Sequence, residues 1–123
     1  MTRYLISFDD GAMTFPAEEL PDVAEAALAV VHEAQEAGVW VFGAGLQSQR
    51  ASIAATEGMI TDGPFPETKE VIGGFAIVEV PSREEALVWA AKIAQACRCD
   101  QEVRELMADP EQDAMLRKAD RRW

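Results

Sequence analysis

Residues 62–80 read DGPFPETKEVIGGFAIVEV, an elaborate connection that leads into a strand. Glycines, prolines and charged side chains fill residues 62–74, between two segments of strand-like composition. A simple chain reversal needs only about two residues, so we interpret this stretch as a built loop. The apolar run that follows predicts a strand at 75–80. Ser82 and Glu85 then form a capping box, which predicts a helix from there to about Cys97.

The rest of the chain supplies the other elements of one domain. In chain order, its patterns predict a strand at 4–8, a helix at 22–37, a strand at 39–46, a short hairpin at 51–61 turning near Gly58, and a last strand at 101–107. Asp22 and Glu25 suggest a capping box at the start of the first helix, and Gly38 its stop. This order predicts an α+β fold: a ferredoxin-like two-layer domain with an antiparallel sheet and two helices on one face.

Both predicted helices have one apolar side, which we expect to face the sheet. The expected core positions are Val23, Ala26, Ala27, Val30, Ala34 and Ala37 in the first helix, and Ala86, Leu87, Ala90, Ile93, Ala94 and Cys97 in the second, with Trp89 at the boundary.

The composition restricts the class of protein. The chain has 123 residues, 49% of them hydrophobic, which suffices for a single core. Its net charge of -11 repels phosphate backbones and anionic lipid, so we expect neither nucleic acid nor membrane as a partner. No signal core or run of roughly 18 apolar residues is present, and we expect a cytoplasmic protein. With one histidine and two cysteines, we predict no metal site, and the glycines match no dinucleotide fingerprint, so we predict no cofactor.

The last residues form a separate feature, so we divide the chain into a domain at 1–108 and a helical arm at 109–123. Asp109 is a candidate cap, Pro110 fits the first helical position, and apolar residues follow at four-residue spacing to Trp123. A terminal tryptophan gains little in water, so we expect the arm to dock on the domain or on a second subunit.

Two glycines in the 39–46 strand leave space on one face of the sheet. Gly43 and Gly45 are expected to share the face of Val41. The space could admit a closely packed helix or a ligand, and the glycines alone do not separate the two.

The loop at 62–70 could hold chemistry. Asp62 is either a turn former that accepts a backbone N–H or, at a strand end facing a pocket, a residue that exchanges protons with a substrate. Lys69 could contact a substrate anion. Phe65, between two prolines, either anchors the loop or forms the wall of a pocket, and Glu67 adds a second acid.

Three other reactive residue types have plainer interpretations. His32 lies opposite the apolar side of its helix, as expected for a solvated position. Cys97 and Cys99 lack the spacing of a redox pair and are interpreted as structural thiols. Arg50 lies in a polar loop, where its side chain is either simply solvated or binds a carboxylate through its guanidinium.

Several of these segments together resemble the DGPF-type YCII-related proteins. The matching residues are Asp62 to Phe65, Glu67 to Glu70, Gly73 to Phe75 and Glu85 to Ala90, and the likeness extends over about residues 3–107. The resemblance implies a dimeric α+β barrel, in which two ferredoxin-like domains pack their sheets together. It also implies proton abstraction or elimination on a small cyclic substrate, as in related dehydrochlorinases and muconolactone-isomerase-like enzymes. The Gly-Leu-His of YCII proteins is here Gly45-Leu46-Gln47, so a histidine mechanism does not transfer.

Two hypotheses follow, and the sequence does not decide whether the chain is an enzyme. In the first, a homodimer acts on a small anionic or cyclic metabolite. Its candidate catalytic residues are Asp62 and Lys69, and its candidate substrate-binding residues are Arg50, Phe65, Glu67, Gly43 and Gly45. In the second, the homodimer binds a metabolite or a protein without catalysis. Some DGPF proteins are encoded beside extracytoplasmic-function sigma factors, so this second role could be regulatory.

Overall fold

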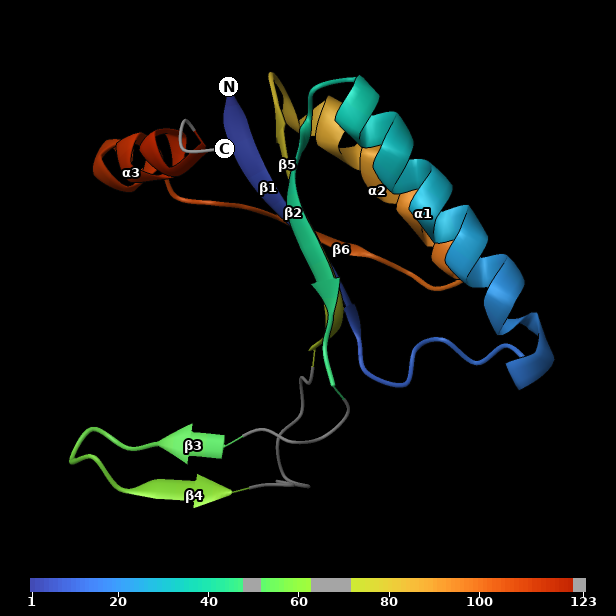
Figure 1. The fold of residues 1–123 in the computed structure, drawn as a ribbon, viewed down its shortest axis with the longest axis horizontal. Helices are drawn as coiled ribbons and strands as arrows, with labels where there is room; N and C mark the ends of the chain where they lie inside the picture. The colour runs from blue at the N-terminus through green and yellow to red at the C-terminus, as the bar shows by residue number, and fades with distance from the viewer. Residues whose placement is uncertain (48–51, 63–71, 121–123) are drawn as a thin grey trace.

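The structure, a computed structural model, describes residues 1–47, 52–62 and 72–120, and the side chains as far as residue 116. Four strands form an antiparallel sheet in the order β2-β5-β1-β6. Helices α1 and α2 cover one face of this sheet (Figure 1). The sheet and the segments that cover it are, in chain order, β1 (Thr2–Asp9), a 3-10 turn η1 (Ala17–Glu19), α1 (Leu20–Glu36), β2 (Trp40–Gly45), β5 (Ile72–Val80), α2 (Arg83–Cys97) and β6 (Glu102–Glu105). The predicted ferredoxin-like α+β fold is confirmed.

The core lies between the two central strands and α2. Every second residue of β5 from Ala76 is buried, as alternation in a strand with one covered face requires. Tyr4 and Ile6 of β1 lie beside these residues. Ala86 and Ala90 of α2 complete the cluster, and their small side chains allow the helix to approach the sheet closely.

Three expected core positions are exposed. Ala26 of α1, Ala37 directly after it and Leu87 of α2 face solvent, with Leu87 at 45% exposure. The buried stripe on each helix is narrower than its apolar side, because only Val23 and Ala34 on α1 are fully covered. The wheel therefore predicted the correct side of each helix but overestimated the width of the contact.

The two helices start differently. In α2 the Ser82 hydroxyl accepts a hydrogen bond from the Glu85 backbone N–H at 3.3 Å, which confirms the predicted cap. The predicted cap at Asp22 is wrong, because α1 begins earlier, at Leu20, with Glu19 in the cap position and no side-chain cap bond. The preceding 3-10 turn leads directly into α1, and Pro21 suits the first turn because it needs no N–H partner. Gly38, at φ +76°, ends α1 as expected.

A bulge in β2 changes which residues face the helices. Trp40 pairs with Val78 and Phe42 with Ile77, so Val41 is the extra residue. Gly43 pairs with the buried Ala76, which puts it on the helix-facing side. The extra residue shifts the alternation of faces along β2, so simple alternation from Val41 does not give the face of the glycines, and their shared face with Val41 stays a prediction.

The predicted hairpin is present as a separate two-stranded sheet (Figure 1). Its strands are β3 (Ser52–Ala54) and β4 (Ile60–Asp62). Gly58, at φ +93°, makes the turn, and the Ala55 N–H donates to the Met59 carbonyl at 2.7 Å.

The C-terminal arm forms α3 (Pro110–Asp120), on the side of the sheet opposite α1 and α2 (Figure 1). The predicted cap is confirmed, because Oδ1 of Asp109 accepts the Gln112 backbone N–H at 3.1 Å. Arg3 joins the arm to the sheet: its guanidinium contacts Glu79 at 3.0 Å and Asp113 at 2.7 Å. Trp123 lies outside the described residues, so its predicted docking stays a prediction. None of the helices in the described ranges is long and apolar enough to cross a membrane.

Candidate functional site

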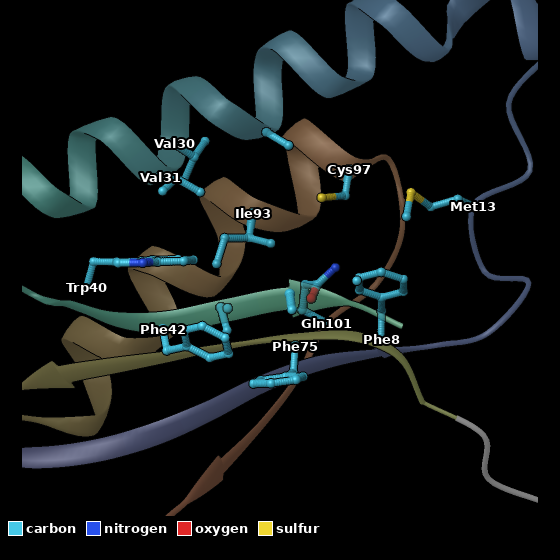
Figure 2. A pocket seen from close by; sticks show the side chains of 15 residues that line it. Phe8, Met13, Val30, Val31, Trp40, Phe42, Phe75, Ile93, Cys97 and Gln101 are labelled. Atoms are coloured by element: carbon cyan, nitrogen blue, oxygen red, sulfur yellow. The ribbon is translucent and has the colours of Figure 1, made fainter. Parts of the chain in front are cut away.

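A cavity of about 530 Å³ lies between the helices and the edge strand β2 (Figure 2). Its lining comes from segments far apart in the sequence: β1, the loop after it, α1, β2, β5, the end of α2 and the residue before β6. The lining residues are Phe8, Met13, Ala27, Val30, Val31, Trp40, Phe42, Gly43, Ala44, Gly45, Phe75, Ala76, Ile93, Cys97 and Gln101. Its volume lies within the range of roughly 300–1,000 Å³ that is usual for small-molecule sites.

The two strand glycines play different parts in this cavity. A Cβ atom at Gly43 would lie 2.6 Å from Cη2 of Trp40 and 2.9 Å from the Phe75 carbonyl oxygen. The space at Gly43 is therefore occupied by the indole ring of Trp40. A Cβ at Gly45 would meet no atom of the described residues within 4 Å. The question that the sequence left open thus has two answers: a side chain of the same strand fills the space at Gly43, and the space at Gly45 is open.

At the other end of the cavity, Phe8, Met13, Cys97 and Gln101 lie near one another (Figure 2). The ring of Phe8 lies against Gly74, where a Cβ atom would come within 2.6 Å of Cζ. The absence of a side chain at Gly74 therefore allows the close approach of this aromatic ring.

The cavity has no charged side chain among the described residues that line it. Its polar side-chain groups are the Gln101 amide, the Cys97 thiol and the Trp40 indole N–H. Burial raises the pKa of the Cys97 thiol. Burial also raises the pKa of Cys99, and the neighbouring Cys97 and Asp100 raise it further. Both free thiols are thus protonated near neutral pH, as structural cysteines are.

The structure places Asp62 at the end of β4, in the separate hairpin, and Asp62 is not among the residues that line this cavity. Its carboxylate is exposed and accepts a hydrogen bond from the Ser52 hydroxyl at 2.6 Å. The catalytic role of Asp62 stays a prediction. His32 lies exposed on α1, as expected.

Four of the candidate residues fall outside the described ranges. These are Arg50, Phe65, Glu67 and Lys69. Of the predicted site residues that the structure describes, Gly43 and Gly45 line the cavity together, whereas Asp62 lies elsewhere.

Several lining residues were missed by sequence reasoning. Val30, Ile93 and Cys97 were assigned to the core because they continue the apolar sides of their helices. They line the cavity, and Ile93 packs against the core cluster as well. Gln101 was predicted only as the start of a strand, and no local pattern in the sequence marks it as a cavity residue.

Metal binding has no candidate in the described part of the chain, where no three histidine, cysteine or acidic side chains form a group that could hold an ion.

Comparison with protein families shows to which family the sequence belongs. The model of the YCII-related domain matches residues 2–108. The chain belongs to the YCII-related family. The match covers the β-sheet, both covering helices and the hairpin, and it stops before α3, which starts at Pro110.

No curated protein matches the sequence significantly. Among solved structures, the chain is similar to 5-chloro-2-hydroxyhydroquinone dehydrochlorinase (TftG) from Burkholderia phenoliruptrix AC1100, in complex with 2,5-dihydroxybenzoquinone. The two share 16% sequence identity over 90% of this chain and 98% of the other, with a TM-score of 0.49. Such a distant likeness says nothing about the reaction or ligand of the YCII-related chain.

Proposed function

We propose that this YCII-related protein binds a small, mostly apolar cyclic metabolite in the cavity beside β2. The observation that supports this function is an uncharged cavity of about 530 Å³ whose wall is open at Gly45. Trp40 and Phe8 supply aromatic surfaces that suit a flat ring.

The test uses p-cresol as a probe and Gly45→Val as the variant. A valine side chain would enter the open space without a clash with the described backbone, because no described atom lies within 4 Å of its Cβ position. We expect Gly45→Val to keep the stability of the wild type and to weaken p-cresol binding at least about tenfold, or about 1.4 kcal/mol. Ala54→Val, an exposed strand position in the hairpin, is the matched control. Equal affinities in all three proteins would contradict binding in this cavity.

The catalytic form of the proposal is a lyase or isomerase reaction that begins with proton transfer, with Asp62 as acid or base and Lys69 contacting the substrate. Its support is the resemblance of this loop to the family motif and the position of Asp62 at the end of a strand. Solvent-deuterium exchange into bound cyclic carbonyl compounds, followed by mass spectrometry, tests it. We expect exchange in the wild type and its loss in Asp62→Asn, without a change in ligand affinity. Binding without exchange in the wild type would instead favour the non-catalytic alternative, a binding or regulatory protein.

We also propose that the protein is a homodimer joined through the face of the sheet that α1 and α2 leave uncovered. Leu5, Ile77 and Phe42 lie in one row across three strands of this face, and Phe42 is 57% exposed. The ring of Phe75 lies 6.0 Å from that of Phe42, which extends the apolar surface. A single sheet face of this kind is stabilised by packing against another apolar layer.

Sedimentation equilibrium tests the dimer. Ile77→Asp puts a charge in the centre of the open face, and we expect it to yield folded monomers from a dimeric wild type. Leu28→Asp, at an exposed position of α1, should leave the dimer intact. A monomeric wild type, or a dimeric Ile77→Asp protein, would contradict this assembly.

A further inference from the structure

We propose that the cavity selects neutral ring compounds that carry a hydroxyl group, and that the side-chain oxygen of Gln101 accepts the hydrogen bond from this hydroxyl. The inference rests on the proposed ligand-binding function and adds to it the class of ligand and the residue that recognises it.

The position of Gln101 supports this role. It lies between the end of α2 and β6, is half-buried, and its side chain lines one end of the cavity beside Phe8 (Figure 2). Its Nε2 donates to the Cys99 carbonyl at 3.4 Å and lies 3.5 Å from the Cys99 sulfur. Because the amide nitrogen is occupied in this way, the amide oxygen is the group with which Gln101 can receive a donor from a ligand.

The surroundings of Gln101 disfavour an anion. The described lining residues include no arginine, lysine or histidine that could neutralise a carboxylate. Moving an ionised group from water into an apolar site is costly unless it is paired. The amide oxygen of Gln101 would also repel a carboxylate, and the chain as a whole has a net charge of -11.

A hydroxyl group fits these conditions better than a wholly apolar substituent does. A buried amide that loses a hydrogen-bond partner destabilises the complex, so a ligand without a donor should bind more weakly. The aromatic side chains elsewhere in the cavity contact the ring through its faces and edges and do not distinguish the substituent.

The test compares three compounds that share one ring and differ in one substituent: p-cresol, p-xylene and p-toluate. Dissociation constants are measured by ligand-observed NMR. In the wild type, we expect p-cresol to bind about fivefold more tightly than p-xylene, as one net hydrogen bond gives. We expect p-toluate to bind most weakly. In Gln101→Leu the preference for p-cresol should vanish while p-xylene binding is kept. Gln95→Leu, at an exposed position of α2, should behave as the wild type.

The outcomes separate this inference from the proposed function. If p-cresol and p-xylene bind equally to the wild type, or if p-toluate binds most tightly, the selection by Gln101 is wrong although the cavity still binds a ligand. If none of the three compounds binds, the proposed function fails and the inference fails with it. The wild-type series decides the ligand class even if Gln101→Leu does not fold, and circular dichroism shows whether it does.

Discussion

At the scale of single residues, the two glycines of β2 give the most specific prediction. In Gly43→Ala the new methyl group would overlap the Trp40 ring and approach the Phe75 carbonyl. We expect the free energy of unfolding to fall by about 1–3 kcal/mol, as overpacking in a core usually costs. Gly45→Ala should change it little, because the same methyl group would meet open space. Urea unfolding of both variants measures this difference, and equal losses would show that Trp40 does not occupy the space at Gly43.

The two cysteines allow a prediction about the pH dependence of thiol reactivity. Burial raises the pKa of both thiols above the ordinary 9.0, so we expect slow alkylation by iodoacetamide at pH 8 that accelerates as pH rises through the raised pKa. Burial favours the neutral thiols over the thiolates. The contribution of the neutral thiols to the free energy of unfolding is therefore present below pH 9 and is lost as they ionise at higher pH.

Only Cys97 lines the cavity, so p-cresol should protect Cys97 from alkylation and leave the rate at Cys99 unchanged. Mass spectrometry of the digested protein separates the two sites. Equal protection of both thiols, or none, would contradict a ligand bound beside Cys97.

At the scale of elements, Arg3 ties α3 to the sheet through its contacts with Glu79 and Asp113. In Arg3→Met we expect faster hydrogen exchange in α3, with a loss of global stability below about 2 kcal/mol, since partly exposed ion pairs contribute little each. Arg104→Met is the control, because Arg104 pairs with Glu102 of its own strand and joins no two elements. Unchanged exchange in α3 of Arg3→Met would mean that other contacts position the arm.

The elements show how far sequence reasoning reaches. Local patterns suffice where the deciding contacts are local, as at the Ser82 cap, the Gly38 stop and the turn at Gly58. They do not predict the bulge in β2, because the bulge at Val41 is set by pairing with β5, about 35 residues further along the chain. The start of α1 was misjudged for a related reason: the 3-10 turn before it positions the helix without a side-chain cap.

At the scale of the whole molecule, the order of elements was enough to predict the ferredoxin-like fold. The cavity was not predictable in the same way. Its walls come from many separate segments, and Phe8, Ile93 and Gln101 become neighbours of one space only through the fold. The loop that begins at Asp62 is conspicuous in the sequence, because it is rich in glycines, prolines and charged residues. An apolar cavity uses the same residue types as a core, so composition does not distinguish the two.

The central claim is that the cavity beside β2 is where the protein holds its small molecule. A ¹H–¹⁵N spectrum of the labelled protein, recorded during a titration with p-cresol, tests this claim directly. The account predicts that the Trp40 indole N–H and the amides of Gly43, Gly45 and Cys97 shift, while the Trp89 indole, which does not line the cavity, stays in place. Shifts confined to residues 52–62, with the Trp40 indole unmoved, would contradict it.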